Sequence, residues 1–234
     1  MGLFEAIIPI SELYAGYANH EVLHGLTFQI QLGAITVIVG PGGSGKSTLL
    51  KVFTKFNPVD EPQFWYRCNV RFPFSTTVCL NQKNQRNCSL QNLLAGSTLG
   101  HTPEEIIRQC WKAYPHIAGK LIHSAHLELN SIPNELARLA EITVRLATPA
   151  HFYFFDEPDA EVASENQTSL SQVMKQQLRY KTVVIVTHNL QFARSIADFC
   201  VLLIDGEVVE SGPVDQFFDN PTHPRTRHYV RMGC

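Results

Sequence analysis

Short apolar runs separated by helical patterns extend along most of the chain. Residues 34–39 form a β-branched run typical of a buried strand, and comparable runs lie at 152–155 and 183–186. The stretches at 89–147 and 164–178 have the character of helices instead. Strands that alternate with helices predict an α/β fold whose central sheet is mostly parallel and carries helices on both faces.

Two local signals refine this pattern. An alternating segment at 26–30, closed by a turn at Gly33, predicts additional β-structure near the N-terminus. Further along, Thr102, Pro103 and Glu105 have the spacing of a capping box with proline at the first helical position. A helical stripe of apolar residues follows it, made of Ile106, Ile107, Cys110, Trp111 and Tyr114.

The composition excludes several classes of protein. The 234 residues suit one large α/β domain, and no linker or internal repeat divides them. Charged residues make up 17% of the chain and the net charge is −2, so we expect no nucleic-acid partner. The apolar runs fall far short of the ~20 residues that cross a bilayer, and the N-terminus lacks the basic segment of a signal peptide.

Cysteine and histidine residues give no clear metal signal. The six cysteines include no CxxC pair, and we interpret them as reduced thiols. His123 and His126 have a spacing that could bind a metal ion, but solvent-facing positions on a helix explain them better.

A glycine-rich segment directly after the 34–39 strand carries the strongest chemical signal. Gly40-Pro41-Gly42-Gly43-Ser44-Gly45-Lys46-Ser47 matches GxxxxGK[ST], and a helix is predicted from Lys46 onward. Glycines let backbone N–H groups point inward, and a helix N-terminus adds partial positive charge. Lys46 would reach the β- and γ-phosphates of a nucleotide, and the Ser47 hydroxyl would hold Mg²⁺.

Polar residues end two of the other predicted strands. Asp156 and Glu157 follow the 152–155 run, and His188 follows the third strand. Open α/β sheets bind ligands at this carboxyl edge. Asp156 would hold Mg²⁺, Glu157 would polarise the attacking water, and His188 suits a hydrogen bond to the γ-phosphate.

These elements, in this order and spacing, resemble the nucleotide-binding subunit of ABC transporters over nearly the whole chain. The resemblance implies an ATP hydrolase that uses ATP and Mg²⁺, with Tyr17 stacking on adenine and Gln82 as the Q-loop glutamine that contacts Mg²⁺ or the water. Tyr14 is a weaker candidate for adenine. Catalysis would involve Glu157, His188 and Gln82, and the metal would contact Ser47, Gln82 and Asp156. Nucleotide contacts are implied for Tyr17, Gly40, Pro41, Gly42, Gly43, Ser44, Gly45, Lys46, Ser47 and Thr48.

The same resemblance implies an organisation and partners. A P-loop NTPase core with an N-terminal antiparallel β part would cover 1–86 and 140–210, a helical subdomain 87–139, and a C-terminal tail 211–234. A transmembrane permease subunit and a second ATPase subunit, identical or different, would be the partners. The chain would then lie at the cytoplasmic, inner face of the cell membrane and touch it only through the permease. Within the family, VTHNLQFARSIAD and the ending ESGPVDQFFDNPTHPRTRHYV look like the phosphate-import ATPase.

Two departures from the family pattern bear on the site, and the segment FWYRCNVRF at 64–72 also lacks the family's usual glycine-containing hairpin. The LSGGQ signature is replaced by Asn130-Ser131-Ile132-Pro133-Asn134-Glu135-Leu136, in which Pro133 lacks an N–H and Glu135 would bring negative charge toward a partner's phosphates. Ser131 could cap the following helix, although an ordinary helix start fits better. After Asp156-Glu157-Pro158, Ala163 stands where the family has the aspartate of its Ser-Ala-Leu-Asp loop.

These departures keep an alternative to the active transporter subunit open. The chain could be a nucleotide-sensing pseudo-ATPase, or the degenerate half of a heterodimer with little turnover of its own. A soluble ABC ATPase of DNA repair or translation fits less well, because those carry tandem cassettes or basic surfaces. A small-molecule P-loop kinase would not need Asp156-Glu157-Pro158 followed by Thr187-His188-Asn189.

Overall fold

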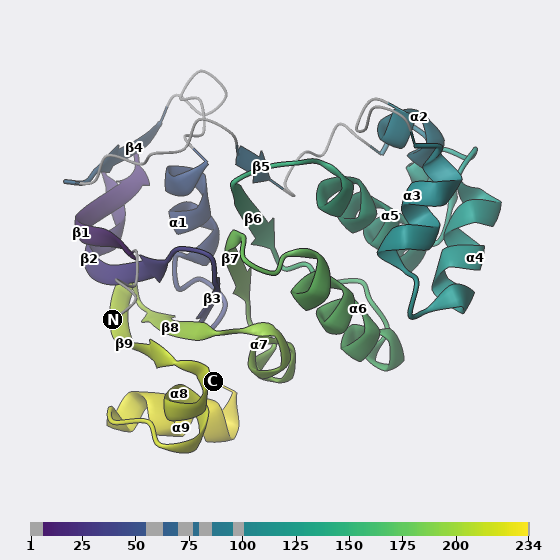
Figure 1. Cartoon of the computed structure of the whole chain (residues 1–234). Coiled ribbons are helices and arrows are strands. Elements are labelled where there is room, and N and C mark those ends of the chain that lie inside the picture. Colours follow the sequence, from purple (N-terminus) through teal and green to yellow (C-terminus); the bar gives the residue numbers. More distant parts are fainter. Residues whose placement is uncertain (1–6, 55–62, 70–76, 80–85, 96–100, 234) are drawn as a thin grey trace, which may run out of the picture.

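The computed structural model describes residues 7–54, 63–69, 77–79, 86–95 and 101–233 (Figure 1). Its strands are β1 (Ile7–Tyr17), β2 (His20–Gln31), β3 (Ile35–Val39), β4 (Phe64–Arg67), β5 (Thr77–Cys79), β6 (Phe152–Asp156), β7 (Thr182–Thr187), β8 (Phe199–Ile204) and β9 (Glu207–Pro213). Its helices are α1 (Lys46–Phe53), α2 (Leu90–Ala95), α3 (Pro103–Cys110), α4 (Pro115–Ser124), α5 (Asn134–Ala147), α6 (Ser164–Gln177), α7 (Leu190–Ile196), α8 (Val214–Asp219) and α9 (Pro224–Met232), with a 3₁₀ turn at Leu129–Ser131.

A six-stranded sheet in the order β5-β6-β7-β3-β8-β9 forms the centre of the fold. All its neighbouring strands run parallel except β8 and β9, which form an antiparallel pair. Every residue of β3 and β7 is buried, which explains why their sequences are continuous β-branched runs rather than alternating ones. The predicted mostly parallel sheet is therefore confirmed.

A second, antiparallel sheet in the order β2-β1-β4 covers one side of the centre, together with α1 (Figure 1). Buried residues alternate with exposed ones along β2, as expected for a strand with one face on the core. Ile38 and Phe154 of the central sheet pack on this side, whereas Val37 and Tyr153, their chain neighbours, face the other. The antiparallel β part predicted for the N-terminal region is thus present.

The helical region α2–α5 lies on the side of the central sheet that is opposite to the antiparallel sheet (Figure 1). Its buried residues belong to the same hydrophobic cluster as the central-sheet residues that face this side. Trp111 is fully buried there, and its indole N–H donates to the Thr143 hydroxyl of α5 at 2.8 Å. The capping box predicted at Thr102 and Glu105 is formed in both directions. The proposed division of the chain stays a prediction, and its boundary between 139 and 140 falls inside the continuous helix α5.

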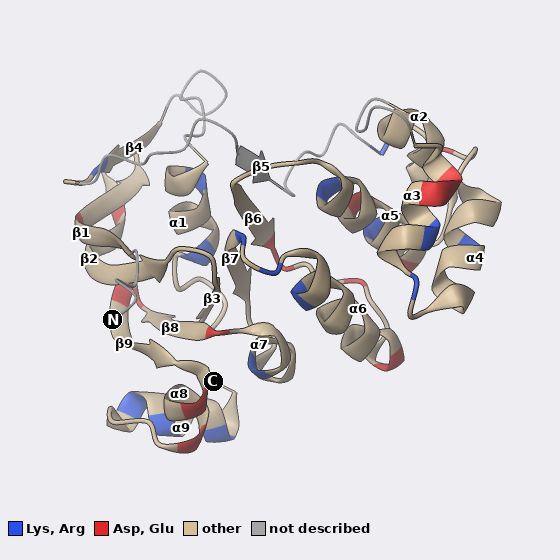
Figure 2. Ribbon diagram, in the orientation of Figure 1, with Lys and Arg blue, Asp and Glu red and all other residues tan. Residues whose placement is uncertain are grey.

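Charged residues of both signs are spread over the helices and loops, while the central strands carry few (Figure 2). In the part of the chain that the structure describes, no helix is both long and apolar enough to span a membrane.

Candidate functional site

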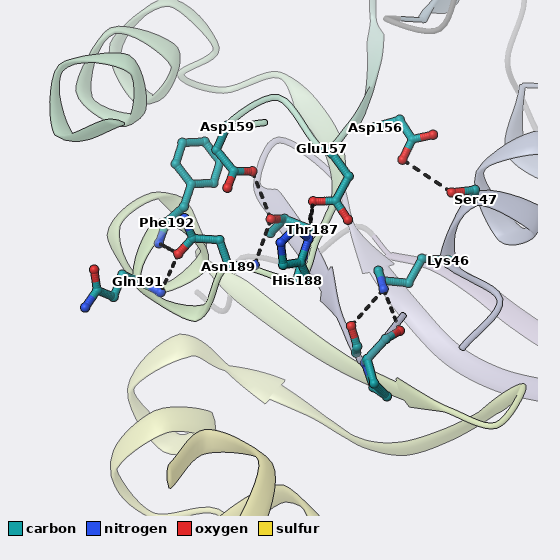
Figure 3. A network of polar contacts seen from close by, with 12 residues as sticks. Lys46, Ser47, Asp156, Glu157, Asp159, Thr187, His188, Asn189, Gln191 and Phe192 are labelled. Carbon is teal, nitrogen blue, oxygen red and sulfur yellow. Dashed lines mark hydrogen bonds and ion pairs between the residues drawn. The ribbon is translucent and has the colours of Figure 1, made fainter. Parts of the chain in front are cut away.

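The parallel strands place three loops at one edge of the central sheet. β3 leads into the glycine-rich loop and α1, β6 ends at Asp156, and β7 ends immediately before His188. Since β3, β7 and β6 are neighbours in the sheet, residues distant in sequence meet here, as Figure 3 shows. This edge is formed by the carboxyl ends of the strands, which is where the sequence predicts the site.

Glycine is required at two points of the loop after β3. Gly45 has φ +98°, which residues with a side chain rarely adopt, and it stands directly before α1. At Gly40, a Cβ atom would lie 2.0 Å from the carbonyl oxygen of Leu203 on β8. The loop can therefore bend into its compact shape and pack against the sheet only with these residues.

Lys46 turns its side chain back into the loop. Its Nζ donates to the carbonyl oxygens of Gly40 at 2.7 Å and Pro41 at 2.9 Å (Figure 3), and the residue is 7% exposed. Burial lowers the pKa of Lys46, while the nearby carboxylates of Glu157 and Asp156 oppose that shift. A phosphate group would provide the compensating negative charge that a half-desolvated ammonium group favours.

The rest of the loop also fits an anion. Gly42 and Gly43 face open space, so a ligand can approach their backbone closely. Among the described residues, the buried hydroxyl of Ser44 has no hydrogen-bond partner, although buried polar groups are normally satisfied. A phosphate oxygen at this loop would satisfy it. Thr48 lies in the first turn of α1 and is buried.

Ser47 and Asp156 bring two oxygen ligands together from α1 and β6. The Ser47 hydroxyl donates to Oδ1 of Asp156 at 3.5 Å. Burial and the neighbouring Glu157 raise the pKa of Asp156, while Arg138, Ser47 and Lys46 act in the opposite direction. Hydroxyl and carboxylate oxygens are ligands that Mg²⁺ prefers, and the cation would stabilise the ionised carboxylate.

Glu157 and His188 contact each other directly. Oε2 of Glu157 lies 2.8 Å from Nδ1 of His188 and also accepts the His188 backbone N–H at 3.3 Å. Because an ionised carboxylate can only accept, the imidazole carries its hydrogen on Nδ1 in this arrangement. Both contacts use Oε2, so Oε1 can accept from a water molecule. The His188 side chain is 68% exposed and can reach a ligand.

Asp159 is a functional candidate that the sequence interpretation missed. It is 4% exposed, and its carboxylate accepts the Thr187 hydroxyl at 2.9 Å, which in turn accepts the Asn189 backbone N–H at 3.0 Å. This chain of bonds fixes the end of β7 on both sides of His188 (Figure 3). This support of β7 becomes visible only in the contact between the Asp159 loop and β7. The one signal in the sequence is an aspartate next to Asp156-Glu157-Pro158.

Two predicted residues lie away from these contacts or outside the described chain. Tyr17 is at the end of β1, where its ring packs 5.5 Å from that of Phe64 and its hydroxyl accepts from Nζ of Lys51 on α1 at 3.0 Å. The structure thus links Tyr17 to α1 but not directly to Asp156, Glu157 or His188. Gln82 lies outside the described residues. Their roles stay predictions.

The segment in place of the signature motif makes contacts within its own chain. The Ser131 hydroxyl donates to the Glu128 carbonyl oxygen at 2.7 Å, so Ser131 does not cap α5, and Pro133 occupies the N-cap position. Glu135 was expected to extend negative charge toward a partner's phosphates. Within this chain its Oε1 accepts the Ala163 N–H and the Asn166 side-chain amide, both at 2.9 Å, at the start of α6, and the expectation about a partner's phosphates stays a prediction. A carboxylate at a helix N-terminus satisfies free N–H groups there, which explains this placement.

The fold and this set of residues define a P-loop nucleoside triphosphatase. Residues 23–192 match the sequence profile of the family described as "ABC transporter", and the chain belongs to that family. Its members bind ATP with Mg²⁺ and hydrolyse it, and their ATP-binding subunits pair and work with transmembrane permease subunits.

Relatives of similar length give a finer comparison. The L-cystine import ATP-binding protein TcyN of Bacillus subtilis is 29% identical over 241 residues, covering 96% of this chain and 93% of the relative. The glutamine transport ATP-binding protein GlnQ of Geobacillus stearothermophilus is 28% identical over 231 residues, covering 92% and 93%. The arginine transport ATP-binding protein ArtM of Bacillus subtilis is 26% identical over 246 residues, covering 96% and 98%.

Solved structures support the fold. A structure of the ATP-binding subunit of an ABC transporter matches with a TM-score of 0.69 at 18% identity, covering 97% of this chain and 99% of that chain. A bacterial Atm1-family ABC exporter with ATP bound matches with a TM-score of 0.74 at 18% identity, and this chain spans 42% of it.

The expected likeness to the phosphate-import ATPase is not supported. These relatives are named for the transport of amino acids, so the two segments that suggested phosphate import do not identify that subtype. Both are short, and the first contains His188, which matches a residue of the whole family.

Proposed function

We propose that this chain is the ATP-hydrolysing subunit of an importer for amino acids or closely related solutes. The observation that supports it best is the match, over more than nine-tenths of both chains, to ATP-binding proteins of amino-acid transport systems. A partner permease would form the solute pathway, and this chain would supply the energy.

The geometry of the site supports a role for most of these residues. Lys46 and the N–H groups of its loop would bind the phosphates, and Ser47 with Asp156 would bind the cation. When bound, Mg²⁺ neutralises phosphate charge and polarises the phosphoryl group. Glu157 would orient and polarise a water molecule through Oε1, and His188 would contact the terminal phosphate from β7. Gln82 and Tyr17 keep their proposed roles in metal or water contact and in adenine stacking.

His188 can donate to a phosphate oxygen in two ways. While Nδ1–H bonds to Glu157, the neutral ring offers Nε2 only as an acceptor. A donated bond from Nε2 therefore requires a protonated imidazole. Otherwise the side chain must leave Glu157, and the neutral ring then donates from whichever nitrogen carries its hydrogen. In both cases, the contact between His188 and the ligand depends on the position of the Glu157 carboxylate.

The nucleotide-sensing alternative rests on the altered signature segment and is not favoured. Glu157 and His188 are both present and in contact, whereas a pure sensor needs no group to polarise water. The relatives also point to a working transport subunit.

Uptake measurements test the proposal. In cells of the source organism whose copy is disrupted, we expect the wild-type chain to restore uptake of at least one labelled amino acid from a panel of cystine, glutamine and arginine. Lys46→Ala should not restore it, while Lys120→Ala, which changes an exposed lysine on α4, should. Restoration of phosphate uptake alone, or equal uptake with Lys46→Ala, would contradict the proposal.

A further inference from the structure

Glu157 has a backbone conformation that needs support. Its φ is +46°, in the left-handed region that bulky residues seldom adopt. Such conformations persist only where surrounding contacts determine them, and they gather at functional sites. The Glu157 N–H donates to the Val186 carbonyl oxygen at 2.8 Å, which fixes one side of the turn.

Arg138 of α5 fixes the other side. Its Nη2 donates to the carbonyl oxygens of both Asp156, at 2.8 Å, and Glu157, at 2.5 Å. One planar guanidinium group thus bridges two successive carbonyls and holds the peptide unit that aims the Glu157 side chain. Both bonds come from Nη2, while Nη1 of the same rigid plane lies next to Glu141. A lysine has one nitrogen in place of these two, so it would keep only part of this arrangement.

Arg138 is itself held in place by a chain of ion pairs. Its Nη1 lies 3.3 Å from Oε2 of Glu141, and the Arg138 and Glu141 side chains are only 12% and 13% exposed. Oε1 of Glu141 accepts from Arg86 at 2.9 Å, and Arg86 also donates to Glu161 at 2.9 Å. Glu161 lies in the loop after Glu157 and also has a positive φ, of +65°. The network therefore ties α5 to both ends of this loop.

We propose that Arg138 is a positioning residue for Glu157, holding the turn at the end of β6 so that the carboxylate stays oriented for hydrolysis. The hydrogen bonds that Arg138 donates to that turn go to backbone carbonyl oxygens, so it acts through Glu157 and not on the ligand. This inference rests on the proposed role of Glu157. The arginine also brings positive charge close to Asp156, which favours its ionised form.

Three variants of the full chain test the proposal. Arg138→Met keeps the apolar stem and removes every donor, Arg138→Lys keeps the charge, and Arg108→Met removes an exposed arginine paired with Glu104 on α3 as a matched control. Each is measured for single-turnover ATP hydrolysis, ATP affinity and backbone amide exchange over residues 155–162. Arg138→Met should slow hydrolysis by at least ~10-fold while its ATP affinity stays within about 3-fold of the wild type. The reason is that misorienting a catalytic group lowers the reaction rate more than it lowers the affinity for the substrate.

Amide exchange and the two other variants distinguish a loss of positioning from a general loss of structure. Amide exchange over 155–162 should rise in Arg138→Met, Arg138→Lys should recover part of the rate, and Arg108→Met should match the wild type. The proposal is overturned if Arg138→Met leaves exchange over 155–162 unchanged, or if ATP affinity falls as much as the rate. Glu157→Gln, run alongside, keeps the two proposals apart. If it hydrolyses ATP at the wild-type rate, the role of Glu157 is wrong, whereas a normal rate in Arg138→Met alone refutes only the role of Arg138.

Discussion

Single side chains at this site combine burial with charge, and that combination makes their ionisation informative. Lys46 and Asp159 are buried and Asp156 is half-buried, and in each case burial is the largest cause of the pKa shift. Lys46 and Asp156 would gain opposite charge from a nucleotide and its cation. The ionised form of Asp159 is stabilised instead by hydrogen bonds from Thr187, from its own backbone N–H and from Asn189.

Asp159 should therefore make the stability of the protein depend on pH. Burial raises its pKa above the ordinary value of 3.8, so the folded chain holds this proton more tightly than the unfolded chain. The resulting stabilisation is fully present below pH 3.8 and is lost as pH rises through the folded pKa. In Asp159→Asn this contribution is gone, so the free energy of unfolding of the wild type relative to the variant should fall as pH rises above 3.8.

Urea unfolding at a series of pH values measures this difference. Asp215→Asn, which removes an exposed carboxylate from α8, controls for the loss of one negative charge. Parallel stability curves for the wild type and Asp159→Asn would show that Asp159 does not titrate differently in the folded chain.

Helices and strands were largely predictable where local chemistry decides them. The buried runs at β3, β6 and β7 and the capping box of α3 follow directly from residue type and spacing. The same local reasoning placed Asp156, Glu157 and His188 at one edge of the sheet. Whether they perform the proposed chemistry stays a prediction.

Contacts between distant elements could not be predicted in this way. Glu135 and Arg138 lie on one helix, but one bonds to the start of α6 and the other to the end of β6. Their sequence signal is only the presence of charges in a helix that is otherwise mostly apolar. Partners that depend on how α5 packs against the sheet become visible only in three dimensions.

The capping box of α3 gives a prediction at the scale of one element. The Thr102 hydroxyl accepts the Glu105 N–H at 3.3 Å, and the Glu105 carboxylate accepts the Thr102 N–H at 2.8 Å. Thr102→Ala should lower the free energy of unfolding by about 1 kcal/mol. Thr168→Ala, at an exposed position inside α6, should change it little, since alanine favours helix interiors. Thermal unfolding checks both, and equal stability of Thr102→Ala and wild type would contradict the prediction.

Across the whole molecule, two hydrophobic clusters on opposite faces of the central sheet hold the site between them. One includes β1, β2 and α1, and the other includes α5, α6 and α7. Lys46 and Ser47 come from the first side, while Arg138 comes from the second and reaches the turn that carries Glu157. The site is thus assembled where the two halves of the core meet at the sheet edge.

The central claim is that this edge binds ATP and that Glu157 supports its hydrolysis. Phosphate release from Mg-ATP, measured for the wild type and Glu157→Gln under identical conditions, tests it most directly. We expect Glu157→Gln to lose activity by about 100- to 10,000-fold, since the amide cannot polarise water as the carboxylate does. Saturating Mg-ATP at ~100 times the dissociation constant should still stabilise this variant by about 2.7 kcal/mol. Hydrolysis by Glu157→Gln at the wild-type rate would contradict the account.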